Sequence, residues 1–205
     1  MCVVILISGR GSNLRALLDS GAPVAAVISN QAGAPGLAIA AQHGVATRVV
    51  EHKAYASREA FDAALATEIE RFAPRLVVLA GFMRVLTPGF VTRFAGRLIN
   101  IHPSLLPAFP GLDTHARALA AGVKLHGCTV HFVTADLDHG PIIAQAAVPV
   151  LADDTVERLA ARVLAQEHSV LPRAVRWFLD GRLVIAEGRV HVKGDDAQLV
   201  LSARP

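Results

Sequence analysis

Short apolar runs rich in Val and Ile recur along the first half of the chain and alternate with segments whose apolar residues have helical spacing. Parallel strands joined by crossover helices produce this pattern, because both faces of such a sheet are covered. The pattern predicts an α/β fold with an open, doubly wound, mostly parallel sheet. The expected strands are Val3–Ser8, Val24–Ser29, Thr47–Val50, Leu76–Ala80 and Leu98–Ile101, and the expected helices are Asn13–Ser20, Gly36–His43 and Arg58–Phe72.

The pattern changes after Pro103, where a Pro-rich loop is followed by strand-like runs on either side of the turn-forming residues Asp136–Pro141. Such a turn between two strands favours antiparallel pairing, so we expect an antiparallel C-terminal portion. The polar tail Lys193–Pro205 is expected to be partly disordered, with Leu199–Leu201 docked. The expected elements are a helix at Thr114–Ala121, strands at Gly127–Val133 and Ala144–Val150, a helix at Thr155–Leu179 and a hairpin within Leu183–Val192.

Composition argues against several classes of protein. Hydrophobic residues make up 53% of the chain, yet no apolar run reaches the roughly 18 residues that span a bilayer. The net charge of +3 is scattered, which argues against a nucleic-acid-binding stripe and fits a small anionic substrate. Two cysteines, Cys2 and Cys128, form no C-x-x-C pair and suit a reducing compartment. We therefore expect a cytoplasmic protein that binds neither membrane nor nucleic acid.

The first expected strand runs into a Gly-rich turn, Ser8–Leu14, where a helix begins with Ser12 or Asn13 suited to cap it. Exposed backbone N–H groups and the helix dipole make such a turn a good cradle for phosphate. It is neither a Walker loop nor the dinucleotide fingerprint, whose third Gly is replaced by Leu14. Any strand-to-helix turn also needs Gly and a cap, so the turn taken alone leaves phosphate binding open.

Two polar residues, Asn100 and His102, stand in the apolar run before Pro103. Because side chains alternate along a strand, the two point to one face. Pro103 ends the strand and places them at its carboxyl end, where open α/β sheets bind ligands. A single histidine in an apolar run is often only a hydrogen-bonded core residue, so both roles stay open here.

A third candidate, Asp138, lies in a tight turn with Gly140 and Pro141, and Asp136 is a competing carboxylate. A turn aspartate commonly caps its own backbone. Together with Asn100 and His102, however, it would complete a site for acyl transfer, with donors for an oxyanion and an acid–base pair. Metal binding and a serine nucleophile have less support, since H-E-x-x-H, H-x-H and G-x-S-x-G motifs are absent from the sequence.

Four segments in this order resemble the phosphoribosylglycinamide formyltransferase family: Ile7–Leu14, Ala80–Leu86, Asn100–Pro107 and Asp138–Pro141. The resemblance covers nearly the whole chain. It implies a Rossmann-like formyltransferase fold and formyl transfer from 10-formyltetrahydrofolate, the cosubstrate, to the amine of glycinamide ribonucleotide in purine synthesis. It implies no metal, and either a monomer or a homodimer.

The resemblance also implies roles for particular residues. We expect a single domain over 1–205, with a phosphate- and substrate-binding half at 1–100 and a catalytic and folate-contacting half at 101–205. The implied catalytic residues are Asn100, His102 and Asp138; the implied substrate-binding residues are Gly11, Ser12 and Asn13 for the phosphate and Glu167 for the ribose; the implied folate-binding residues are Met83, Arg84, Val85, Leu86 and Asn100, with Arg58 at the glutamate tail.

Other functions remain as alternatives. Methionyl-tRNA formyltransferase and formyltetrahydrofolate deformylase share this core and trio, but the first adds a C-terminal domain and the second an N-terminal regulatory domain. The length of the chain and its phosphate turn favour a small phosphorylated acceptor, and its start at the first strand leads us to expect an independent protein. A non-catalytic nucleotide-binding module would keep the turn and use His102 only for packing. His139, Ala108 and Asp113 depart from the family pattern and affect only the expected loop shapes.

Overall fold

A computed structural model describes residues 2–202, which form two compact units. Unit 1 contains the described residues up to Asn100 together with Val133–Ala135, and unit 2 contains Ile101–Phe132 and the described residues from Asp136 onward. The chain passes from one unit to the other inside strand β5 (Leu98–His102). The single domain expected over residues 1–205 stays a prediction.

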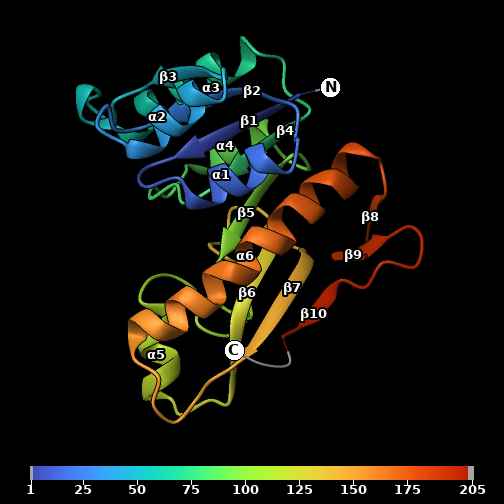
Figure 1. The fold of residues 1–205 in the computed structure, drawn as a ribbon. Coiled ribbons are helices and arrows are strands. Elements are labelled where there is room, and N and C mark those ends of the chain that lie inside the picture. The colour runs from blue at the N-terminus through green and yellow to red at the C-terminus, as the bar shows by residue number, and fades with distance from the viewer. Residues whose placement is uncertain (1, 203–205) are drawn as a thin grey trace. The chain divides into compact units, whose positions relative to one another are not determined.

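Unit 1 is built on a parallel sheet with the strand order β3-β2-β1-β4-β5 (Figure 1). A mostly parallel α/β fold is thereby confirmed. The remaining strands of unit 1 are β1 (Val3–Ile7), β2 (Val24–Ser29), β3 (Ala46–Val49) and β4 (Leu76–Leu79). Its helices are α1 (Ser12–Asp19), α2 (Pro35–Gln42), the 3-10 helix η1 (His52–Ala54), α3 (Arg58–Glu70) and α4 (Pro88–Arg93).

Helix α4 is absent from the sequence-based expectations, because six residues are too few to show a helical period. The residues that favour the start of this helix are nevertheless present in the sequence. Thr87 accepts a hydrogen bond from the N–H of Phe90, and Pro88 occupies the first helical position. Thr-Pro is a favourable helix start, since the hydroxyl caps a free amide and proline needs no N–H partner there.

The central strands β1 and β4 of unit 1 are buried on both faces of the sheet, as their continuous apolar sequences require. Val4 and Leu6 of β1 belong to the cluster that includes Phe61 and Leu65 of α3 and Phe90 of α4. Since side chains alternate along β1, its other residues point to the opposite face, where α1 and α2 contact each other. Each fully buried Leu or Phe contributes about 1.5–3 kcal/mol to such a core.

Unit 2 contains the antiparallel portion that the sequence predicts. Strands β6 (Leu125–Phe132) and β7 (Ile142–Pro149) pair antiparallel, and β10 (Leu199–Leu201) adds to β7 in parallel. The docking of Leu199–Leu201 is therefore confirmed, while residues 203–205 of the expected disordered tail lie outside the described residues. The other elements are α5 (Thr114–Ala120), α6 (Val156–Leu179) and the hairpin β8 (Leu183–Ala186) and β9 (Arg189–Val192).

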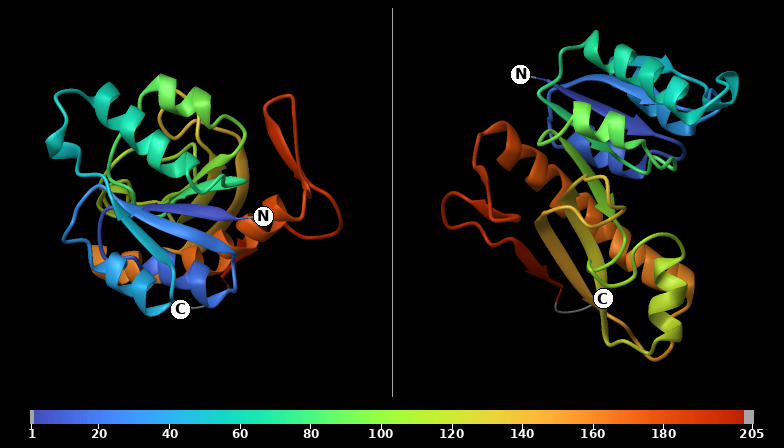
Figure 2. Two further views of the ribbon diagram at one scale, coloured as in Figure 1. Left: turned by 90° about the horizontal axis from the view of Figure 1, so that it is seen from above. Right: turned by 180° about the vertical axis from the view of Figure 1, so that it is seen from behind.

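The long helix α6 packs along β6 and β7 (Figure 2). Its buried residues Leu159, Val163 and Val170 recur at helical spacing, so one apolar stripe faces the strands. Thr155 caps the helix by accepting from the N–H of Arg158. Within residues 2–202, no helix is long and apolar enough to cross a membrane.

The turn between β1 and α1 depends on two glycines that touch. A Cβ on Gly36, the second residue of α2, would lie 2.5 Å from the Cδ1 of Ile7 and 3.2 Å from both the Gly11 Cα and the Gly9 carbonyl oxygen. The N–H of Gly36 also donates to that carbonyl at 3.1 Å. Close approach of α2 therefore fixes the path of the Gly-rich turn.

We predict that Gly36→Ala lowers the free energy of unfolding by about 1–3 kcal/mol, because the added methyl group overpacks the turn. Gly89→Ala is the matched control, since Gly89 also follows a helix-initiating proline and a Cβ there meets nothing within 4 Å. The control should leave stability unchanged or raise it by up to about 1 kcal/mol. Urea unfolding measures both, and equal effects of the two substitutions would contradict the proposed contact.

Candidate active site

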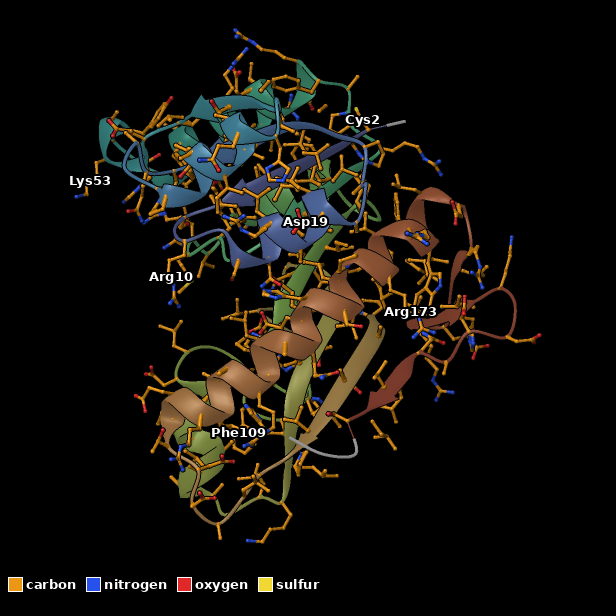
Figure 3. The ribbon with its side chains drawn as sticks, in the orientation of Figure 1. Cys2, Arg10, Asp19, Lys53, Phe109 and Arg173 are labelled. Atoms are coloured by element: carbon orange, nitrogen blue, oxygen red, sulfur yellow. The ribbon has the colours of Figure 1, made fainter. Side chains whose placement is uncertain are left out.

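The phosphate-turn candidates lie at the carboxyl end of β1 in unit 1. Gly11 adopts φ +78°, which favours glycine, and it is the N-cap of α1. The expectation that Ser12 or Asn13 caps the helix is wrong, because the helix already begins at Ser12. Gly11 has no side chain to offer, so no N-cap side chain bonds to the first amides of α1. Arg10, in the same turn, is exposed (Figure 3).

The folate candidates Met83–Leu86 follow β4 in unit 1. Met83 and Val85 are 65% and 53% exposed, which is unusual for large apolar side chains in an otherwise well-buried unit. Arg84 lies over the ring of Phe61 at 5.8 Å, and Leu86 packs against the core. Arg58 is the exposed first residue of α3. The loop Met83–Leu86 thus exposes the apolar side chains of Met83 and Val85, with the cation Arg84 between them in the sequence.

The catalytic candidates His102 and Asp138 meet in unit 2. The Nδ1 of His102 lies 3.5 Å from the Oδ2 of Asp138, and the two side chains are only 6% and 7% exposed. The competing carboxylate, Asp136, is on the exposed part of the same turn. Asp138 has φ +56°, a conformation that Asp tolerates better than most residues. A buried histidine and a buried carboxyl group thus lie within salt-bridge distance of each other.

Backbone groups of the loop between β5 and α5 hold this pair. The carbonyl oxygen of Phe109 lies 3.0 Å from the Nε2 of His102, and the N–H of Gly111 donates to the Oδ2 of Asp138 at 2.9 Å. Because a carbonyl can only accept, Nε2 carries a proton. Each ring nitrogen of His102 thus faces an oxygen atom. The sequence revealed this loop only as Pro-rich.

Side chains around the loop fix it in turn. The hydroxyl of Thr114 donates to the carbonyl of Pro103 at 2.6 Å, and that of Thr129 donates to the carbonyl of Ser104 at 2.7 Å. Ser104 donates to the carbonyl of Ala108 at 2.7 Å. The loop that supplies Phe109 and Gly111 is therefore ordered by hydrogen bonds from α5, from β6 and from its own Ser104.

A second histidine faces Asp138. The Nε2 of His131 lies 3.8 Å from the Oδ1 of Asp138, and its Nδ1 lies 2.9 Å from the carbonyl oxygen of Phe132. Burial lowers the pKa of His131, and the nearby Asp138 opposes this in part. His131 is therefore a neutral neighbour of the carboxylate at pH 7. Sequence reasoning missed it because its place on β6 shows no motif.

His115 and His126 form a further pair in unit 2, with the Nδ1 of the first 3.2 Å from the Nε2 of the second. One ring must donate and the other accept, so the pair shares a proton. The ring of Phe109 lies edge-on to His126, with centroids 5.9 Å apart. Burial lowers the pKa of both histidines, that of His126 to about 4. This neutral pair packs against the loop that holds His102.

The remaining candidates lie on separate elements. Glu167 is on α6 and only 7% exposed. Burial raises the pKa of the Cys128 thiol, and the charge of Glu167 adds to this. Asn100 is half-buried on β5, the strand that also carries His102. Over residues 2–202, no group of three or more His, Cys, Asp or Glu side chains is arranged to hold a metal ion.

Comparison with known proteins defines the class. Residues 1–175 match the model of the formyl transferase family, and the chain belongs to that family. Among its relatives, phosphoribosylglycinamide formyltransferase from Escherichia coli is 52% identical over 95% of this chain and 94% of its own length. The human trifunctional purine biosynthetic protein adenosine-3 is 47% identical over 90% of this chain, which corresponds to 19% of that longer protein.

The solved structures agree with these relatives. Glycinamide ribonucleotide transformylase 1 from Symbiobacterium toebii has a TM-score of 0.91 and 52% identity, covering 94% of this chain and 93% of its own. The family assignment made from the four sequence segments is confirmed.

The depressed pKa of His126 predicts a loss of stability in acid. Between pH 6.5 and about 4 the unfolded chain binds a proton that the folded chain does not, so stability falls as the pH falls through this window. From about pH 7.5 to about pH 4.5 the loss due to His126 is about 2–3 kcal/mol. His126→Gln removes the titrating group and should shrink the loss by that amount in urea unfolding.

The exposed His191 provides the control for this test. His191→Gln should keep the native dependence of stability on pH. If His126→Gln also kept it, the neutral buried state assigned to His126 would be wrong.

Proposed function

We propose that the protein transfers a formyl group from 10-formyltetrahydrofolate to the amine of glycinamide ribonucleotide, a step of de novo purine synthesis. The observation that carries the proposal is the buried pair of His102 and Asp138, held by an oxygen and an N–H of the same backbone loop. The family match and the names of the relatives at up to 52% identity support the reaction and the acceptor.

The reaction requires one bond to form and one to break. The ribonucleotide amine attacks the formyl carbon, and negative charge develops on the formyl oxygen in a tetrahedral intermediate. The bond from that carbon to the folate nitrogen then breaks. The amine loses a proton and the folate nitrogen gains one, so a group that handles protons and a donor to the oxyanion both contribute to the rate.

His102 is proposed as the donor to the oxyanion. Its Nε2–H points at the carbonyl oxygen of Phe109, which marks where an oxygen acceptor is received. The formyl oxygen would take this hydrogen bond in place of that carbonyl. Asp138 stabilises the protonated ring from the opposite nitrogen and organises the proton that moves to the folate. Asn100, two positions earlier on β5, is proposed as a second donor.

Binding is assigned to the other candidates. The amides at the start of α1, with Gly11, Ser12 and Asn13, are proposed to hold the phosphate, since backbone N–H groups at a helix N-terminus favour anions. Glu167 is proposed to accept hydrogen bonds from the ribose hydroxyls. The exposed apolar loop Met83–Leu86 is proposed to bind the folate ring, with Asn100 beside it and Arg58 at the anionic glutamate tail.

The alternative reactions differ in the acceptor. A deformylase would transfer the formyl group to water, and a methionyl-tRNA formyltransferase would transfer it to a charged tRNA. The near-complete match to phosphoribosylglycinamide formyltransferase favours the ribonucleotide. A binding module without catalysis is disfavoured by the buried contact between His102 and Asp138, because a packing role for His102 would not need a buried carboxyl group beside it.

The first test measures formyl transfer from 10-formyltetrahydrofolate with three acceptors: glycinamide ribonucleotide, water and methionyl-tRNA. We expect turnover with the ribonucleotide, and His102→Ala should lower kcat by roughly 100- to 1000-fold because it removes a donor to the oxyanion. Hydrolysis alone would point to the deformylase, and no reaction would point to a binding module.

The role of Asp138 is tested by Asp138→Asn, which keeps an acceptor for the N–H of Gly111 but removes the charge. We expect kcat to fall by about 100-fold while the KM for the ribonucleotide changes little, since the phosphate is held elsewhere. Asp136→Asn is the matched control in the same turn and should retain near-native turnover. Full activity in Asp138→Asn would remove Asp138 from the mechanism.

A further inference from the structure

One buried hydroxyl in unit 1 connects the phosphate turn to the folate loop. Ser8, which directly precedes Gly9, is 5% exposed. Its Oγ accepts from the N–H of Met83 at 2.8 Å and donates to the Oδ1 of Asn30 at 2.6 Å. Its backbone N–H donates to the carbonyl of Gly81 at 3.1 Å. Ser8 thus makes two separate bonds to the segment Gly81–Met83.

Asn30 fixes the direction in which the Ser8 hydroxyl points. Asn30 is 2% exposed, and its Nδ2 lies 3.1 Å from the Nδ1 of His52. Because the hydroxyl has a single proton and gives it to Asn30, a lone pair remains for Met83. Only a small side chain that both donates and accepts fills this position.

The segment held by Ser8 needs such support. Gly81 has φ +75°, and Met83 exposes 65% of its surface, so the side chain of Met83 gains little from packing. The bond from the Met83 N–H to Ser8 therefore helps to fix the backbone just before Arg84 and Val85, beside the buried side chain of Phe82. On its other side, Ser8 leads into Gly9, whose carbonyl accepts from Gly36.

We infer that Ser8 is a positioning residue for cosubstrate binding: through Met83 it holds the loop Met83–Leu86 in the conformation that receives the folate. The inference rests on the proposed function for the identity of the ligand. Without the hydroxyl, the Met83 N–H loses its acceptor and the loop gains other conformations, so part of the binding free energy is spent on ordering it.

The test compares Ser8→Ala with Ser29→Ala. Ser29 is a matched control, since it is fully buried at the end of the neighbouring strand β2. Among residues 2–202 its hydroxyl bonds only within its own turn, to the carbonyl and N–H of Gln31. For Ser8→Ala we expect the KM for 10-formyltetrahydrofolate to rise about 5- to 30-fold. The KM for the ribonucleotide and kcat should change far less, and Ser29→Ala should leave the folate KM near native.

Two further readouts separate the possible failures. Hydrogen exchange at the Met83 amide should quicken in Ser8→Ala and not in Ser29→Ala, which tests the bond without reference to any activity. Ser8→Thr keeps the hydroxyl and should restore a low folate KM. If the wild-type enzyme is active and Ser8→Ala and Ser29→Ala have the same KM for the folate, the inference is overturned. If the wild-type enzyme shows no folate-dependent transfer, the proposed function is overturned instead.

Discussion

The imidazole of His102 is held by an oxygen at each of its two nitrogens, and much of the architecture of unit 2 maintains those oxygens. One belongs to a carboxylate and the other to a backbone carbonyl of Phe109. The positions of these two oxygen atoms depend on residues that are separated from His102 in the sequence. The carboxylate comes from a turn after β6 and is fixed by the N–H of Gly111, so a single loop between β5 and α5 sets both ends of the ring.

In unit 1 most of the residues proposed to bind the substrates lie where strands end. The carboxyl ends of β1, β2 and β4 lead into the Gly-rich turn proposed to hold the phosphate, into Asn30, and into the loop Met83–Leu86 proposed to bind the folate. Because the strands are parallel and adjacent, these ends lie along one edge of the sheet. A short serine side chain can therefore bond to both neighbouring strands' loops. The arrangement explains why a buried polar residue at the end of β1 is compatible with stability.

The sequence predicted most of the elements and the class of fold because buried parallel strands and amphipathic helices leave periodic patterns. It also indicated His102 and Asp138, since polar residues at strand ends and in tight turns stand out. It did not reveal His131, the pair of His115 and His126, or the acceptor at Phe109. Those depend on which backbone groups a loop presents after folding, and a carbonyl oxygen is present at every residue.

The neutral histidines have a consequence for the charge at His102. Burial lowers the pKa of His115, His126 and His131, and the charge of His102 adds to the lowering in all three. Rings that stay neutral do not repel a proton on His102, whereas three additional cations nearby would. Their neutral nitrogens still donate and accept hydrogen bonds that order the surrounding backbone. Histidine thus suits these positions better than lysine or arginine, because it supplies polar ring atoms to a buried site without a permanent charge and leaves Asp138 beside His102 without competing cations.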